Sequence, residues 1–421
     1  MQLKLPSTPT RPGEKGQAII LIIFAIIGLI GVSALAIDGT NAFLDSRRAE
    51  TAASAAALTA ALTRIEGGNW RAAALATAAA NGYDNNGVTN TVEMNTPPLS
   101  GPYSGNSEYI EVIITSHLKT YFAVVIGVPY ITNRSLVISQ SKPSELGEMF
   151  KGYALVSLAP ETQCELHRGF WIHSEATLNF EGGGLFVNSN NPECAFISFG
   201  SGSIRVRDAS PISVVGGADI QKPKLITPYP IETGIAPIPF PIPYKMPRAG
   251  CGSKIATPDG LGSISSGNWD EGVFPPEGVT ILGSGVYCLQ DDFIVADGTY
   301  LEGGNVVIVM EDGNVKISGS AEVHLGAPQS GPNQGLLIYM PVGNRGIISL
   351  NGNDDSEFKG TILAPGADLR INGLDNLHGA AYRSQIIAYY VEVDGTDNIL
   401  IKYEDEQNYD TYTMPEVILI K

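Results

Sequence analysis

The pattern of hydrophobic and polar residues divides the chain into a long apolar helix, a small mixed segment and a series of short strands. Residues 18–37 read AIILIIFAIIGLIGVSALAI, 20 residues without a charge. At about 1.5 Å rise per residue, a helix of this length spans roughly 30 Å, the thickness of the hydrocarbon core of a bilayer. The run therefore predicts a membrane anchor, which includes Ala18, Ile19, Phe24, Gly28, Gly31, Ala36 and Ile37.

The helical pattern continues beyond the apolar run. Residues 38–64 keep helical spacing without a break, so one helix is expected over 16–65. A cleavable signal peptide is the alternative, because the sequence SALA at 33–36 resembles a cleavage site. Signal peptides have an apolar core of only about 7–15 residues, which is shorter than this run and favours the anchor.

The residues before the run indicate its orientation. Lys4, Arg11 and Lys15 precede the apolar segment. Positive charge favours the cytoplasmic side of a membrane. Residues 1–15 are therefore predicted to be a cytoplasmic tail, and the bulk of the chain is expected outside the membrane, on the cell surface.

Alanines form regular rows on the second half of the helix. One row has i, i+4 spacing and the next row lies beside it: Ala49, Ala53, Ala57 and Ala61, then Ala52, Ala56 and Ala60. Small residues in such rows let helix backbones approach closely, which suggests docking on a partner helix. The alternative is that alanine is simply the best helix former.

Residues 66–141 show a mixture of helix and strand patterns. A second alanine-rich helix is expected over 70–81, and SEYIEVIITS alternates apolar and polar residues as a strand does. The segment LKTYFAVVIG is predicted to be a short buried helix, and ITNRSLVIS another strand. Together they predict a small α+β module.

From about residue 150 the chain consists of short apolar strands separated by Gly, Asn and Asp. Strand-turn-strand units recur about every 18–24 residues, a spacing that favours a β-solenoid, or parallel β-helix, over 150–421. A β-sandwich or jelly roll is the alternative. The chain as a whole is then α+β and mostly β.

A proline-rich segment interrupts this region at 223–248. Proline favours extended structure and lacks a backbone donor. The segment could be a recognition peptide for a proline-binding module. Apolar residues alternate with the prolines, however, which favours an excursion packed on the solenoid.

The N-terminal segment resembles that of TadE/TadG-like proteins of Tad (tight adherence, or Flp) pilus assembly. The resemblance is carried by Gly16-Gln17-Ala18, the apolar run, Ala36-Ile37-Asp38, Arg47-Arg48 and the alanine block. Further along, NGNDDSEFKGTILAP and SQIIA resemble the external part of large TadG-like proteins. Pilin-like members carry Glu where this chain has Leu21, so the resemblance is closer to the large TadG-like type, in which the segment stays as an anchor.

Composition and charge narrow the classes of partner. The chain has 421 residues, a net charge of −17 and a pI of about 4.7. Nucleic acid is disfavoured as a partner, because binding to phosphates needs clustered Lys and Arg. The 48 glycines and 27 prolines fit turn-rich β structure.

The four cysteines suggest disulfides. An even number on the external side of a membrane is typical of disulfide-bonded domains. The simplest of the three connectivities pairs Cys164 with Cys194 and Cys251 with Cys288, and four free buried thiols are the alternative. No spacing typical of a zinc site is present.

The sequence contains no strong catalytic motif and predicts no cofactor or metal site. Glycoside hydrolysis needs two carboxylates that face one sugar bond. The candidate pairs lie beside Gly or Asn and are expected in turns: Asp291-Asp292, Glu311-Asp312 and Asp354-Asp355. The loop GNDDSE offers oxygen ligands for calcium, although turn structure explains it as well. The histidines are scattered, and His167 and His173 are expected to be structural or solvated.

These observations together predict a membrane-anchored, non-enzymatic surface protein. The resemblance implies a role in Tad-type pilus assembly or pilus-linked adhesion, with other pilus-assembly proteins as partners of the N-terminal helix. Surface glycans or host cells are the expected targets of the external domain, where Trp171, Trp269, Tyr389 and Tyr390 could stack on sugars. The alternatives are a β-helix enzyme acting on polysaccharide and a filament-forming, pilin-like subunit.

Overall fold

The computed structural model describes residues 15–208, 210–351, 353–373, 381–396 and 398–420. These residues form two compact units. The first unit comprises 15–144 and 415–420, and the second is Glu145–Met414. The predicted boundary of the large domain at 421 is therefore wrong, because the C-terminal strand pairs within the first unit. The predicted tail lies outside the described residues, apart from Lys15.

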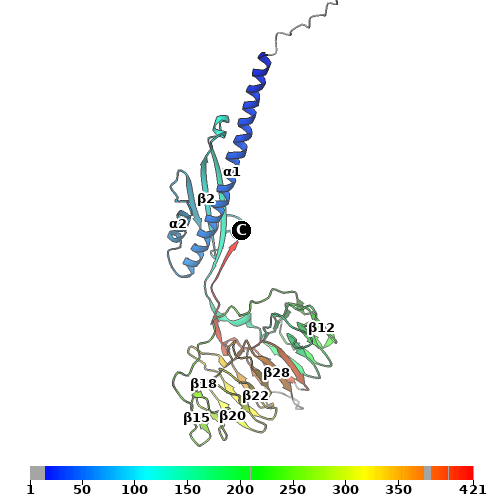
Figure 1. The fold of residues 1–421 in the computed structure, drawn as a ribbon. Helices are drawn as coiled ribbons and strands as arrows, with labels where there is room; N and C mark the ends of the chain where they lie inside the picture. The colour runs from blue at the N-terminus through cyan, green and yellow to red at the C-terminus, as the bar shows by residue number, and fades with distance from the viewer. Residues whose placement is uncertain (1–14, 209, 352, 374–380, 397, 421) are drawn as a thin grey trace, which may run out of the picture. The chain divides into compact units, whose positions relative to one another are not determined.

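The first unit is a sheet with two helices on it (Figure 1). Its helices are α1 (Lys15–Ile65) and α2 (Trp70–Ala80). Its antiparallel strands follow the order β1 (Asn90–Asn95), β2 (Tyr109–Lys119), β3 (Tyr130–Lys142) and β34 (Glu416–Ile420). Helix α2 begins where the side chain of Asn69 accepts a hydrogen bond from the N–H of Ala72 at 3.2 Å, which satisfies one of the unpaired donors of a helix start.

The predicted short buried helix at LKTYFAVVIG is wrong in kind and in burial. The first two residues end β2, and the 3₁₀-helix η1 (Ala123–Ile126) follows in the connection to β3. Ala123 is buried, whereas Val125 and Ile126 are exposed. An apolar composition predicts burial in a soluble protein. Here it fails for Val125 and Ile126, which lie at the tip of the strand pair, beyond the bonds that Asp38 of α1 makes to residues 121–123.

The second unit consists mainly of parallel strands in three stacked sheets, within the part of the chain that the structure describes. The first sheet has the order β14 (Glu232–Thr233), β11 (Ile212–Val214), β8 (Leu185–Val187), β5 (Leu155–Ser157), β30 (Ile386–Ala388), β27 (Thr361–Ala364), β24 (Leu336–Tyr339), β21 (Val306–Met310), β18 (Gly285–Leu289), β16 (Gly267–Trp269). The second sheet has the order β12 (Ala218–Ile220), β9 (Phe196–Ser198), β6 (Phe170–Ile172), β31 (Val391–Gly395), β28 (Asp368–Gly373), β25 (Ile347–Leu350), β22 (Val315–Ile317), β19 (Phe293–Val295).

The third sheet has the order β13 (Ile226–Thr227), β10 (Ser203–Val206), β7 (Thr177–Glu181), β32 (Asn398–Lys402), β29 (Ala381–Arg383), β26 (Glu357–Lys359), β23 (Glu322–Gly326), β20 (Tyr300–Gly303), β17 (Ile281–Leu282), β15 (Ser263–Ile264). The antiparallel pair β4 (Leu146–Glu148) and β33 (Asp410–Tyr412) adds to this unit. Short 3₁₀-helices complete it: η2 (Met149–Gly152), η3 (Pro223–Leu225) and η4 (Asp405–Gln407).

Successive strands of the second unit visit the three sheets in turn. Strands β5, β6 and β7 lie in the first, second and third sheets, and β8 to β10 repeat that order. Because every pair in these sheets is parallel, the unit is β-helix-like and differs from a jelly roll, whose strands are antiparallel. The expected period of 18–24 residues is too narrow, since Leu155 pairs with Leu185 and Val315 with Ile348. Turns of variable length between strands change the period without changing the register.

The chain enters this stack of strands in its middle. Strands β5, β6 and β7 pair on one side with β8, β9 and β10, which follow them directly. On the other side they pair with β30, β31 and β32, which come last in the sequence among the described strands of the three sheets. The chain therefore first forms the strands up to β14 at one end of the stack. It then continues at the opposite end with β15, and the later strands lead back to β5, β6 and β7.

The proline-rich segment makes this crossing. Its apolar side chains pack on the outer face of the first sheet, with Ile242 buried against a cluster that includes Val307 and Leu363. Asn188 fixes the segment: its side chain donates to the carbonyl of Ile238 and accepts from the N–H of Ile238, both at 2.8 Å. The segment thus covers apolar surface that the first sheet would otherwise expose.

The interior between the three sheets is filled by aligned apolar side chains. Parallel register places like residues over one another, as with Phe170 on Phe196, whose ring centroids lie 5.1 Å apart, and Phe358 on Tyr382, at 5.2 Å. Such offset aromatic pairs add to the stability gained from burial alone.

Candidate functional site

The predicted anchor residues lie on a part of α1 that the first unit leaves bare. All seven residues are exposed, and Phe24 exposes 68% of its surface. At Gly28 and Gly31 an added Cβ would meet no atom within 4 Å. Figure 1 shows this part of α1 projecting beyond the sheet. A soluble protein rarely leaves so large an apolar surface uncovered, and the helix is long and apolar enough to cross a membrane.

Asp38, the first residue after the apolar run, holds the connection between β2 and β3. Its carboxylate accepts from the backbone N–H of Tyr121 and Phe122 at 2.9 Å, and from that of Ala123 at 2.7 Å. Burial raises the pKa of the Asp38 carboxyl, but these bonds to its charged form outweigh burial, so the pKa lies below its ordinary value of 3.8. The clamp is fully formed above that value and weakens as the pH falls through the lower pKa of the folded protein.

Replacing Asp38 with alanine is expected to free this connection. The N–H groups of Tyr121, Phe122 and Ala123 would lose their charged acceptor, and their amide hydrogens would exchange faster with solvent. Hydrogen exchange followed by mass spectrometry measures this effect. The amides of the β2–β3 ladder, such as that of Ile113, serve as the internal control and should keep their rates. Unchanged exchange in 121–123 would contradict the clamp.

Asp45 makes a second polar clamp on the same face of α1. Its carboxylate accepts from Tyr83 Oη at 3.0 Å, from Asn133 Nδ2 at 2.8 Å and from the hydroxyl of Ser116. Burial, and then the bond to Asp45, raise the pKa of the Tyr83 hydroxyl above its ordinary value of 10.0. Sequence reasoning missed both clamps. The signal was two carboxylates seven residues apart on a helix that is otherwise apolar or rich in alanine, since that spacing places them on one face.

The alanine rows of α1 face the unit's own sheet. Both rows are fully buried, in a cluster with α2 and the apolar side chains of β2 and β3. Ser139 Oγ donates to the carbonyl of Ala57 at 2.8 Å, and Ser141 Oγ donates to that of Ala61 at 3.2 Å. The rows are therefore buried within the first unit, where the small side chains let α1 approach both α2 and the sheet closely.

The cysteines form the simplest pairing considered, Cys164–Cys194 and Cys251–Cys288. The second bond joins Cys251, just after the proline-rich segment, to Cys288 in strand β18. Disulfides persist in oxidising compartments, so they favour an extracytoplasmic second unit.

The aromatic side chains considered for sugar stacking contact other protein groups. The ring of Trp171 stacks on His173 at 3.9 Å, and the guanidinium of Arg168 lies 4.0 Å from its centroid. Trp269 is buried, and Tyr390 stacks on His167 at 4.7 Å. A cavity of about 110 Å³ beside Trp171 is smaller than the roughly 300–1,000 Å³ of typical ligand sites.

Histidines have partners within the fold. His173 lies 3.1 Å from Glu392 and 3.2 Å from Asp394, and His324 lies 3.1 Å from Glu322. His378 falls outside the described residues. These contacts agree with the expectation of structural or solvated histidines.

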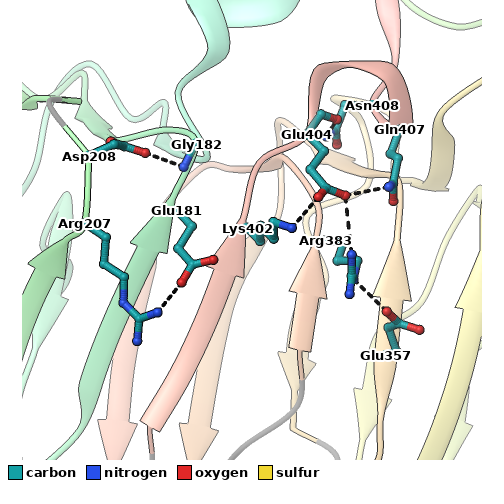
Figure 2. A network of polar contacts seen from close by, with 10 residues as sticks. All are labelled: Glu181, Gly182, Arg207, Asp208, Glu357, Arg383, Lys402, Glu404, Gln407 and Asn408. Carbon is teal, nitrogen blue, oxygen red and sulfur yellow. Dashed lines mark hydrogen bonds and ion pairs between the residues drawn. The ribbon is translucent and has the colours of Figure 1, made fainter.

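A charged network runs along the outer face of the third sheet (Figure 2). Glu357 pairs with Arg383 and with Lys359, each at 2.7 Å, and Glu404 pairs with Lys402 and Arg383. Burial raises the pKa of Glu357, but Lys359 and Arg383 lower it by more, so the net shift is downward. Because these groups are partly exposed, each pair adds little stability.

Of the adjacent carboxylates singled out in the sequence, five lie in turns and bends, as expected, and Asp292 lies directly before β19. Asp292 accepts from the backbone N–H of Asn314 at 2.8 Å, and this bond links the residue before β19 to the residue before β22. Among the described residues, no group of three or more His, Cys, Asp or Glu is arranged to hold a metal ion.

A cavity of about 620 Å³ lies beside β4 and β33. Its lining carries both signs of charge, from Lys245 and Arg248 and from Asp405 and Asp410. Burial, and then the charge of Asp405, raise the pKa of the Asp410 carboxyl. The volume falls in the range of about 300–1,000 Å³ that ligand sites occupy.

Comparison with known proteins adds no relative. No protein-family model matches the chain, and no curated protein matches it either.

Proposed function

We propose that this chain is a single-pass membrane protein that displays a β-solenoid outside the cytoplasmic membrane and serves Tad-type pilus assembly or pilus-linked adhesion. The observation that carries the proposal is the bare apolar part of α1, which continues without a break into the folded first unit. The pilus role rests on the TadG-like pattern of the N-terminal segment.

Charge and redox chemistry support the proposed orientation. Positive residues before the run favour a cytoplasmic N-terminus, and disulfides favour an oxidising compartment for the second unit. A solenoid offers long, regular surfaces suited to contact rather than to a single reaction centre. Surface glycans or host cell surfaces are its targets in this proposal, and the cavity beside β4 and β33 is a contact point of suitable size.

Deleting the gene in the producing cell tests the proposal. Loss of surface pili, or weaker attachment to a surface, is expected in the deletion strain. Reintroduced wild-type protein should restore both properties. A variant that no longer stays in the membrane should restore neither. A deletion strain with normal pili and normal attachment would contradict the proposed role.

Two further results would favour the alternatives. Turnover of a polysaccharide by the purified protein would favour a β-helix enzyme. A chain that begins at Gln17 and is recovered in a sheared filament fraction would favour a pilin-like subunit. N-terminal sequencing and intact mass measurement distinguish that outcome from a full-length anchored protein.

A further inference from the structure

The connection between β2 and β3 presents an apolar surface that no element of the described structure covers. Residues 120–130 read TYFAVVIGVPY and contain no charged side chain. Its exposed apolar residues are Tyr121, Val124, Val125, Ile126, Val128 and Tyr130, and Val125 exposes 70% of its surface. Contiguous apolar patches on a monomer mark sites of interaction.

The connection is rigid rather than a loose loop. Thr120 N–H donates to the carbonyl of Pro129 at 3.1 Å, and the N–H of Val128 donates to the carbonyl of Ala123 at 3.0 Å. Gly127 ends η1 with φ of 87°, a conformation that favours glycine. The exposed apolar side chains are therefore held outward by the backbone.

Its position relative to the anchor is fixed by Asp38. This residue follows the last residue of the apolar run and binds the backbone at the start of η1. In Figure 1 the tip of β2 and β3 lies beside α1, at the end of the first unit from which the apolar helix projects. If the run spans the bilayer, this tip stands at the membrane surface.

The chemistry of the tip suits the interfacial zone of a bilayer. Tyrosines are enriched at that level because their rings are apolar and their hydroxyls are polar. The nearest charged residues in sequence on either side, Lys119 and Arg134, are exposed and positive, although the chain as a whole carries −17. Positive side chains next to an apolar tip favour a surface with anionic headgroups.

We infer that the β2–β3 tip is a second membrane contact, which inserts its apolar side chains into the interfacial zone beside the anchor. The inference rests on the proposed membrane anchoring and deepens it. Two contacts, joined by Asp38, would fix the tilt and rotation of the first unit on the bilayer, which one helix alone leaves free.

Site-specific labelling of the full chain in lipid nanodiscs tests this inference. All four native cysteines form disulfides, so one introduced cysteine can carry an environment-sensitive dye. The variants are Val125→Cys in the tip, Phe24→Cys in the anchor and Leu99→Cys as the matched control. Leu99 is apolar and 73% exposed, and it lies between β1 and β2, at the end of the sheet away from the tip.

The nanodiscs contain phosphatidylethanolamine and phosphatidylglycerol, with and without lipids that carry a quencher either near the headgroup or in the acyl chain. We expect blue-shifted, quenched emission at positions 24 and 125, and solvent-like emission at 99. Quenching at 24 but not at 125 would overturn the second contact and leave the anchor standing. No quenching at either position would overturn both. A blue shift at 125 without lipid quenching would mean a protein contact, and quenching at 99 would mean nonspecific adsorption; both would overturn the inference.

Discussion

Replacing both Ile23 and Ile27 with lysine is expected to move the protein out of the membrane fraction. These residues lie one turn apart in the middle of the apolar run and are exposed, so no contact within the first unit is lost. A lysine at the centre of a membrane helix costs about 2.5–3.5 kcal/mol on insertion scales. Two such costs on one face are large compared with the net free energy of inserting one helix.

Extraction of membranes with alkaline carbonate measures this effect. The matched control places lysine at Leu58 and Leu62, which have the same spacing on the same helix and are also partly exposed. Because these positions lie beyond the apolar run, the control should stay with the membrane. If the double variant Ile23→Lys, Ile27→Lys resists carbonate extraction, the run is not the anchor.

Replacing Gly217 with alanine is expected to destabilise the second unit by about 4 kcal/mol, in the range that only severe backbone or core defects reach. An added Cβ would lie 1.8 Å from the carbonyl oxygen of Pro192. The backbone cannot simply withdraw, because the N–H of Gly217 donates to the carbonyl of Asn191 at 2.9 Å and its own carbonyl accepts from Phe196 at 3.2 Å. Relief of the clash would break pairing between β12 and β9.

Thermal unfolding of the full chain in detergent, followed by far-UV circular dichroism, measures this loss. A fall in Tm of roughly 10 °C is expected from the usual relation between stability and Tm. Gly326→Ala is the control, since Gly326 lies in strand β23 and its added Cβ would meet no atom within 4 Å. Equal Tm values for the two variants would contradict the close approach at Gly217.

The features that sequence predicted are those encoded locally. An uncharged run of 20 residues specifies a helix long and apolar enough to span a membrane, without reference to the rest of the chain. Alternating strands between Gly, Asn and Asp turns indicated a mostly β second unit, and parallel pairing in stacked sheets was expected from their recurrence. The observed disulfides are the pairing that closes the shortest loops.

The features that sequence did not predict depend on distant partners. Strand β34 follows a unit of 270 residues and pairs with β3. Its sequence EVILI predicts a strand but does not indicate which strand it pairs with. The entry of the chain in the middle of the stack is likewise a property of pairing between β5 and β30. Asp38 bonds to backbone groups more than 80 positions away, so its role was visible only as a charge placed oddly at the end of an apolar run.

The return of the chain to the first unit has a mechanical consequence. The second unit is joined to the first through two covalent connections, one after β3 and one before β34, and these strands are antiparallel neighbours with Lys142 opposite Glu416. A force that pulls on the second unit is therefore divided between two adjacent strands that are drawn in the same direction. Unfolding of the first unit under this force requires both strands to slide along the sheet and to break many backbone hydrogen bonds at once. A cut in the connection before β34 leaves the covalent link through β3 intact.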